Sequence, residues 1–146
     1  MRFASRRFFL LVLMLALLPA AFARAEPVSG ADAAEIRAVI YRQIDAFKRD
    51  DAQGAFALVS PAVREAFGTP QKFLAVVRMA YRAVYRPAAV VFMDMLILGD
   101  EVVQQVQVTD RGGQVWIAYY GMQRQPDGSW RTNGCRLAQP VRIIPA

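Results

Sequence analysis

Histidine is absent from this chain of 146 residues, and cysteine occurs once, at Cys135. Without histidine, neither a histidine-based catalytic triad nor an ordinary zinc site can be built. A single cysteine also excludes an internal disulfide, so the domain depends on packing for its stability. Acid–base chemistry would fall to aspartate, glutamate, tyrosine, Lys48 or Lys72. We therefore expect neither a metal nor a cofactor.

A large excess of one charge is also absent once the N-terminal segment is set apart. The formal net charge is +6, from 18 basic and 12 acidic residues. Four of the basic residues lie before position 25 and all of the acids lie after it, so residues 26–146 carry a net charge of +2. We therefore expect no binding to nucleic acid, because such binding needs concentrated positive charge.

The first 25 residues have the layout of an export signal. Three arginines precede an uninterrupted apolar run of eleven residues, 8–18, and small residues follow it. A helix of that length reaches about 16 Å, about half of the hydrocarbon core of a bilayer, so a stable membrane span is not expected. The sequence predicts cleavage after Ala23 or Ala25, and a periplasmic or secreted protein.

Two export routes fit this segment. Ser5–Leu10 (SRRFFL) resembles the twin-arginine consensus, whereas the very apolar core favours the general secretory route. No cysteine lies near the cleavage site, which excludes a lipid-modified N-terminus, and only an uncleaved signal would anchor the protein to a membrane. After cleavage, we expect a linker over residues 26–30, a single domain over residues 31–139 and a C-terminal tail over residues 140–146.

The domain begins with a predicted helix whose apolar residues recur at helical spacing. Asp32, with Glu35 three residues later, is a capping arrangement that predicts the start of this helix, and Asp50 lies near its end. The apolar positions that would face the core are Ile36, Ile40, Ile44 and Phe47.

Three further caps divide the next part of the chain. Asp51, Ser60 and Thr69 can each accept a hydrogen bond at a helix start, and proline follows the last two at the first helical position. The helices that they predict end at Val59, at Gly68 and, for the longest one (residues 70–85), just before Arg86-Pro87.

After position 88 the pattern changes from helix to strand. Residues 89–98 (AVVFMDMLIL) are apolar on both faces apart from Asp94, as in a well-covered strand. Turn sequences then separate three further strands, over residues 101–110, 114–125 and 130–137. This order predicts an α+β fold in which N-terminal helices pack on a curved four-stranded antiparallel sheet.

The chain between Ile36 and Leu137 also contains a set of short motifs at a characteristic separation. They are Ala55-Phe56, Ser60-Pro61, Phe67-Gly68-Thr69-Pro70, Phe73, Tyr81, Arg86-Pro87, Phe92, Asp127-Gly128-Ser129-Trp130-Arg131 and Gly134. With these motifs the chain resembles an uncharacterised bacterial family, domain of unknown function 4864. The order of helices and meander, with its D-G-x-W-R hairpin, also resembles the nuclear-transport-factor-2-like (cystatin-like) cone.

These resemblances imply a fold and leave the activity open. The cone superfamily includes isomerases, cyclases and dehydratases, together with many non-catalytic binding and assembly modules. The chain departs from the usual pattern at Thr132, where such folds have an apolar residue. Thr132 is therefore either a tolerated hydroxyl or a polar position in a ligand pocket.

The first candidate site is a row of arginines. Arg78, Arg82 and Arg86 stand four residues apart, on one face of the helix predicted over residues 70–85. Like charges at this spacing destabilise an isolated helix by about 0.2–0.5 kcal/mol per pair, so something is expected to offset them. One interpretation is an anionic ligand or an envelope surface. The alternative, which we favour, is pairing with the acids of the next segment: Asp94, Asp100, Glu101 and Asp110.

The second candidate is Asp94. A carboxylate buried in an apolar strand has a raised pKa, as a general base needs. A tyrosine would then donate a hydrogen bond to a developing oxyanion, and the candidates are Tyr81, Tyr85, Tyr119 and Tyr120. The resemblance to the cone superfamily, which includes isomerases, is compatible with a cofactor-free isomerase or lyase of this kind. The alternative is that Asp94 faces outward or pairs with Arg86.

The remaining candidates lie on the last two predicted strands. Trp116, Tyr120 and Met122 share one face, where they either line a ligand cavity or form ordinary core. Cys135 has no base to activate it, so we expect a small buried side chain. A bulge at Gly134 would place Cys135 on the inner face together with Trp130, Thr132 and Leu137.

These observations favour an exported, non-catalytic ligand-binding or assembly module. Its partner would be a small apolar or anionic ligand, or an envelope component, held on the concave face of the cone or by Arg78, Arg82 and Arg86. Two alternatives stay open. One is a cofactor-free isomerase or lyase that uses Asp94 as general base, and the other is a structural envelope protein that associates with itself as an oligomer.

Overall fold

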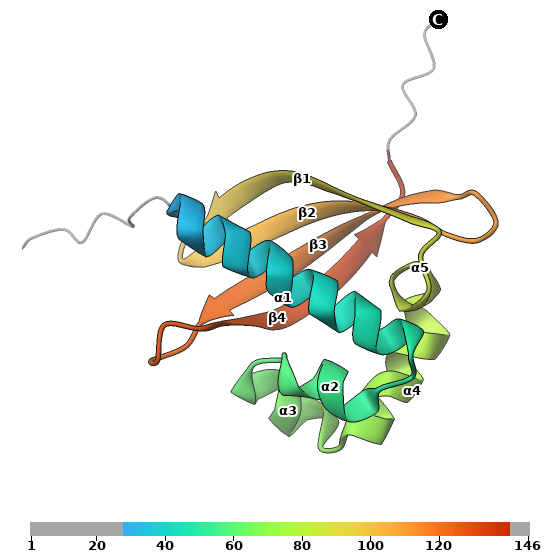
Figure 1. Cartoon of the computed structure of the whole chain (residues 1–146), viewed down its shortest axis with the longest axis horizontal. Coiled ribbons are helices and arrows are strands. Elements are labelled where there is room, and N and C mark those ends of the chain that lie inside the picture. The colour runs from blue at the N-terminus through green and yellow to red at the C-terminus, as the bar shows by residue number, and fades with distance from the viewer. Residues whose placement is uncertain (1–27, 141–146) are drawn as a thin grey trace, which may run out of the picture.

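The computed structural model of the chain describes residues 28–140 (Figure 1). The predicted export signal and its cleavage positions lie outside these residues, as do residues 26–27 of the predicted linker and residues 141–146 of the predicted tail. Within the described range, helices come first and strands last: α1 (Gly30–Lys48), α2 (Ala52–Ala57), α3 (Pro61–Phe67), α4 (Pro70–Ala80), α5 (Arg82–Tyr85), β1 (Ala89–Leu98), β2 (Glu101–Thr109), β3 (Val115–Arg124) and β4 (Trp130–Ala138).

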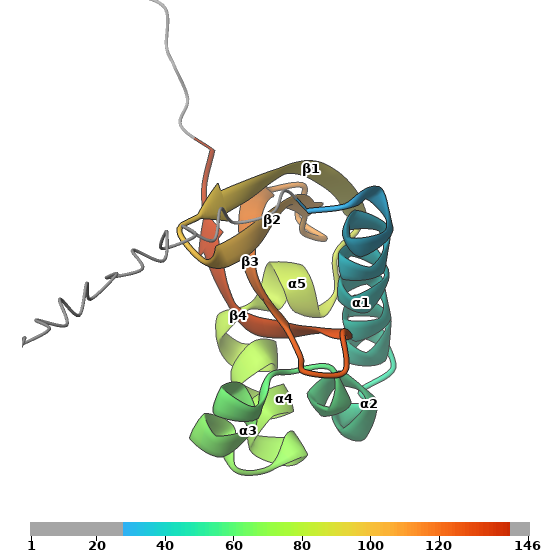
Figure 2. The ribbon, with the colours of Figure 1, turned by 90° about the vertical axis from the view of Figure 1, so that its left-hand side faces the viewer.

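The strands form one antiparallel sheet in the order β1-β2-β3-β4, which confirms the predicted α+β meander. The sheet curves around the helices (Figure 2). In both views α1 runs along the sheet, whereas α2, α3 and α4 gather at one end of the domain (Figures 1 and 2). None of the helices between residues 28 and 140 is long and apolar enough to cross a membrane.

The start of α1 differs from the prediction. Ser29, not Asp32, is the N-cap: its hydroxyl accepts a hydrogen bond from the Asp32 backbone N–H at 3.1 Å and donates one to the Asp32 carboxylate at 2.8 Å. The side chains of Asp32 and Glu35 instead accept hydrogen bonds from Trp130, from its indole N–H at 3.0 Å and its backbone N–H at 3.4 Å. The predicted capping pair therefore fastens α1 to β4. The apolar residues predicted to face the core are buried: Ile36, Ile40, Ile44 and Phe47.

The three predicted caps of the shorter helices are confirmed. The side chain of each cap accepts a hydrogen bond from the backbone N–H three residues later. The distances are 2.8 Å for Asp51, 3.3 Å for Ser60 and 3.2 Å for Thr69. The helix expected to reach Val59 ends at Ala57, because the backbone groups of Leu58 and Ser60 form hydrogen bonds with β4 instead. Thr132 donates its N–H to the Leu58 carbonyl and accepts the Ser60 N–H, both at 2.9 Å.

The helix predicted over residues 70–85 is interrupted at Tyr81. This residue has φ −124° and ψ 45°, outside the helical region, and separates α4 from α5. Arg78, Arg82 and Arg86 consequently do not share one continuous helix face, and the single face predicted from their spacing is wrong. The break turns the chain towards β1 and leaves Tyr81 between two short helices.

Two bulges bend the sheet. In β1 the register shifts between Phe92 and Met95, and the carbonyls of Met93 and Asp94 accept hydrogen bonds from the side chains of Gln104 and Gln105, at 2.8 and 3.2 Å. In β4, Thr132 pairs with Met122 and Gly134 pairs with the adjacent residue Gly121, so Asn133 has no partner in β3. This extra residue is the bulge that was predicted at Gly134. Gly134 has φ 150°, which favours glycine. This bulge turns both Thr132 and Cys135 towards the helices.

Candidate functional site

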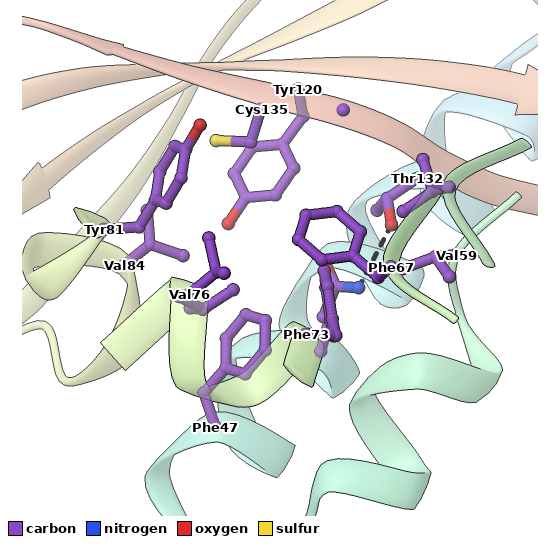
Figure 3. Close-up of a pocket in the computed structure, with 14 residues that line it drawn as sticks. Phe47, Val59, Phe67, Phe73, Val76, Tyr81, Val84, Tyr120, Thr132 and Cys135 are labelled. Atoms are coloured by element: carbon purple, nitrogen blue, oxygen red, sulfur yellow. Dashed lines mark hydrogen bonds between the residues drawn. The ribbon is translucent and has the colours of Figure 1, made fainter. Parts of the chain in front are cut away.

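An apolar cavity lies between the helices and the inner faces of β3 and β4 (Figure 3). Its volume is about 180 Å³. The buried part of its wall consists mostly of aromatic and β-branched side chains: Phe47, Val59, Phe73, Val77 and Val84. Half-buried residues form the part nearer to solvent: Val63, Phe67, Val76 and Tyr81. The helix break at Tyr81 thus contributes one side of the opening.

Two of the polar side chains in the wall are hydrogen-bonded to each other. The Gln43 amide donates to the Thr132 hydroxyl at 3.0 Å and to the Ala55 carbonyl at 3.2 Å. The Thr132 hydroxyl in turn donates to the Leu58 carbonyl at 3.3 Å. Thr132 therefore lies in the wall of the cavity, and the hydrogen bonds of its hydroxyl are made to groups of the protein.

Tyr120 differs from this pair. Its side chain extends from β3 into the cavity, with the hydroxyl directed towards the helices (Figure 3). The residue is 1% exposed, and its hydroxyl oxygen has no hydrogen-bond partner among residues 28–140. Burial raises the pKa of this phenol well above its ordinary value, and the neighbouring Cys135 raises it further. The hydroxyl therefore stays neutral, and it can donate or accept one hydrogen bond to a molecule in the cavity.

Cys135 lies directly across from Tyr120 in the β3–β4 pairing and also lines the cavity. Burial raises the pKa of its thiol to about 12. Because the thiolate is the reactive form, the raised pKa lowers the reactivity of this cysteine near neutral pH. Its placement on the inner face, with Trp130 and Thr132, is the one predicted from the bulge at Gly134.

The cavity wall carries no charged side chain among the residues that the structure describes. Within the same part of the chain, no three cysteine, aspartate or glutamate side chains are grouped so that they could hold a metal ion. The wall therefore offers apolar contacts, contacts with aromatic rings and the hydroxyl of Tyr120, which is unpaired among residues 28–140.

The arginines lie outside this cavity. Arg78 and Arg86 both bind the Asp50 carboxylate, at 3.0 and 2.9 Å, and the Tyr85 hydroxyl donates to the same group. Arg82 is exposed and forms no ion pair with the residues between 28 and 140. The partner of Arg78 and Arg86 is therefore Asp50 in the α1–α2 loop. The predicted pairing with the acids of the strand region is wrong: no ion pair joins these arginines to Asp94, Asp100, Glu101 or Asp110 among the described residues.

Asp50 gives the domain a pH-dependent contact. Its pKa is lowered, first by the hydrogen bond from Tyr85 and then by Arg78 and Arg86. A carboxyl with a lowered pKa in the folded state stabilises that state above its unfolded pKa of about 4, and the contribution is lost as the pH falls through the folded pKa. We expect Asp50→Asn to flatten the acid side of a melting-temperature profile recorded from about pH 7 to about pH 2.

Asn is suited to this test because Asp50 has φ 55°, a region that Asp and Asn both tolerate. Asp94→Asn is the matched control, since it removes the same charge from an exposed strand position. An acid profile unchanged by Asp50→Asn, or changed equally by Asp94→Asn, would contradict the assignment. The effect is expected to be small, because the ion pairs are solvent-exposed.

Asp94 does not reach the cavity. It lies in the β1 bulge with its side chain exposed, whereas the catalytic hypothesis needs a carboxylate buried beside a tyrosine hydroxyl. The tyrosines proposed to assist it are also separated. Tyr81 and Tyr120 line the cavity, but Tyr85 donates its hydroxyl to Asp50. Tyr119 lies on the outer side of the sheet, where the guanidinium carbon of Arg136 is 5.7 Å from the centre of the Tyr119 ring.

The aromatic set on β3 is divided as well. Trp116 donates its indole N–H to the Asp110 carboxylate at 3.2 Å and packs at the edge of the core, away from the cavity. Met122 is buried core, and Tyr120 alone lines the cavity. Gln43 was not predicted as a site residue, although the sequence carries a signal for it: it is a polar residue inside the apolar stripe of α1, between Ile40 and Ile44.

Fold and cavity together define a class of protein: a small α+β domain whose curved sheet and covering helices enclose an apolar pocket. The sequence matches the family described as "Domain of unknown function (DUF4864)" over residues 29–143, and the chain belongs to this family. The resemblance drawn from the short motifs is thereby confirmed.

The structure is also similar to the crystal structure of an NTF-2-like protein of unknown function from Burkholderia xenovorans LB400. The two share 12% sequence identity, and the match covers 79% of this chain and 91% of that chain with a TM-score of 0.47. No curated protein matches the sequence.

Proposed function

We propose that this protein is an exported, non-catalytic module that binds a small molecule in the cavity between its helices and sheet. The observation that carries the proposal is the Tyr120 hydroxyl, which is buried, directed into the cavity and without a partner among residues 28–140. Leaving such a group unpaired costs about 1–3 kcal/mol. A ligand that supplies the missing hydrogen bond recovers this free energy.

The non-catalytic part of the proposal is supported by the protonation of the groups in the wall. The raised pKa values of Tyr120 and Cys135 keep both protonated near neutral pH, so neither serves as a base there. Asp94, the carboxylate considered as general base, is exposed on β1. Export is supported by the charge, apolar run and small residues of the first 25 positions.

Native mass spectrometry of the protein purified from the periplasm, beside the same sample denatured, tests both parts. We expect a mass difference that disappears on denaturation, and a denatured chain that begins at residue 24 or 26. Equal native and denatured masses would contradict a carried ligand, and a full-length chain would contradict cleavage. The same spectra report the oligomeric mass and so test the self-association alternative.

Two tryptophan variants on α4 locate the bound molecule. Val76 is half-buried in the cavity wall, so Val76→Trp is expected to fill the opening and abolish the mass difference. Its neighbour Ala75 is exposed, so Ala75→Trp adds the same side chain to the surface and is expected to leave the difference intact. Loss of the ligand from both variants, or from neither, would place it outside the cavity.

A further inference from the structure

The size of the cavity limits what it can hold. An apolar cavity of about 150 Å³ accommodates one benzene molecule. The cavity described here is slightly larger, at about 180 Å³, so it has room for a single six-membered ring with one small substituent. Phe47, Phe67 and Phe73 present their rings to this space, as Figure 3 shows, and such walls favour a flat, apolar guest.

The charge of the wall limits the ligand further. A carboxylate or ammonium group buried without a partner is strongly unfavourable, and no charged side chain described by the structure lines the cavity. Arg78 and Arg86 do not supply one, since both are held by Asp50. Arg82, which follows Tyr81 of the opening, is exposed and is not part of the wall. The ligand must therefore be neutral, which separates this site from the anionic partner considered for the arginines.

The hydrogen-bonding groups fix the polar requirement. Gln43 and Thr132 already bond to each other and to backbone carbonyls. The Cys135 thiol is a weak donor. In this wall the Tyr120 hydroxyl is the buried polar group without a partner among residues 28–140, and it is directed into the space (Figure 3). One oxygen on the ligand is enough to satisfy it.

From these three limits we propose that the ligand is a neutral, single-ring molecule carrying one hydroxyl or carbonyl oxygen, which hydrogen-bonds to the Tyr120 hydroxyl. This inference rests on the proposed function and specifies the chemical class that the cavity takes. The apolar ring fills the space beside the phenylalanines, and the single oxygen pairs with the otherwise orphaned hydroxyl.

Three probes of matched size test the proposal: phenol, toluene and benzoate. Titrated into the purified protein and followed by calorimetry, phenol is expected to bind about fivefold to tenfold more tightly than toluene, which corresponds to one hydrogen bond to a buried group. Benzoate has a similar ring but carries a charge, and we expect no binding.

Two tyrosine variants on β3 connect the preference to one hydroxyl. In Tyr120→Phe the preference for phenol over toluene should disappear, while toluene still binds. In Tyr119→Phe, where the altered residue lies on the outer face of the sheet, the preference should remain as in the original protein. The comparison of probes on the unaltered protein is informative even if a variant folds poorly.

The outcomes separate this inference from the proposed function. Equal binding of phenol and toluene, or tighter binding of benzoate, would overturn the ligand class and retain the cavity as the binding site. If no probe binds, the ligand class is overturned. The proposed function then stands only if the native mass spectra show a carried molecule that Val76→Trp removes, and it falls if they do not.

Discussion

Replacing Phe73 by alanine is expected to lower the free energy of unfolding by about 3–5 kcal/mol, the range found for buried phenylalanines. Phe73 of α4 is 7% exposed. Its ring centre lies 5.9 Å from that of Phe47 in α1, 5.6 Å from that of Phe56 in α2 and 5.2 Å from that of Phe67 in α3. One side chain therefore joins four helices, and its removal leaves a void that rigid neighbours cannot fill.

Urea unfolding followed by tryptophan fluorescence and circular dichroism measures this loss. Phe92→Ala is the matched control: Phe92 is half-buried on β1 and contacts Tyr41, with ring centres 4.8 Å apart. We expect a smaller loss there, because the Phe92 ring is less buried and leaves a space open to water. Equal losses in the two variants would show that Phe73 does not hold the helices together as proposed.

The second large effect has the opposite sign. Tyr120→Phe is expected to stabilise the ligand-free protein, by about 1–3 kcal/mol, whereas most substitutions destabilise. The variant keeps the ring, which fills the core, and removes a buried hydroxyl that has no partner among residues 28–140. The same hydroxyl is the group proposed to bind the ligand. A gain in stability with a loss of ligand preference is the trade-off expected of a binding site.

The measurement requires protein freed of any carried molecule, obtained by unfolding, dialysis and refolding before the urea titration. Tyr119→Phe serves as control, since the same atom is removed from the outer face of the sheet, and its stability should change by no more than about 0.5 kcal/mol. A decrease in the stability of Tyr120→Phe would show that the hydroxyl is hydrogen-bonded in the ligand-free protein, and would remove the basis of the proposed function.

Local signals were sufficient to predict most of the elements. The caps Asp51, Ser60 and Thr69 and the strand over residues 89–98 were read from neighbouring residues, because a cap or a turn depends on contacts within a few positions. The errors arose where distant residues compete. Ser29 replaced Asp32 as the cap of α1, because the Asp32 carboxylate also accepts a hydrogen bond from Trp130.

The candidate site was harder to predict, because it is assembled from segments far apart in the chain. Tyr120 and Thr132 were named as pocket residues from the sequence, but Trp116, named with them, packs elsewhere. Gln43 was missed. It acquires its role only where α1 meets β4, 89 residues further along the chain. Strand alternation gives the face of a side chain, and it does not give what lies opposite that face.

The sequence by itself determined the α+β order of elements, the family and the absence of histidine chemistry, since each of these follows from composition, local propensity or short motifs. Tertiary structure decided the rest. It brought Asp50 against Arg78 and Arg86, left Asp94 exposed in a bulge and buried the Tyr120 hydroxyl without a partner. The physical reason is that burial and pairing depend on the whole surface surrounding a group, which only the packing of distant segments creates.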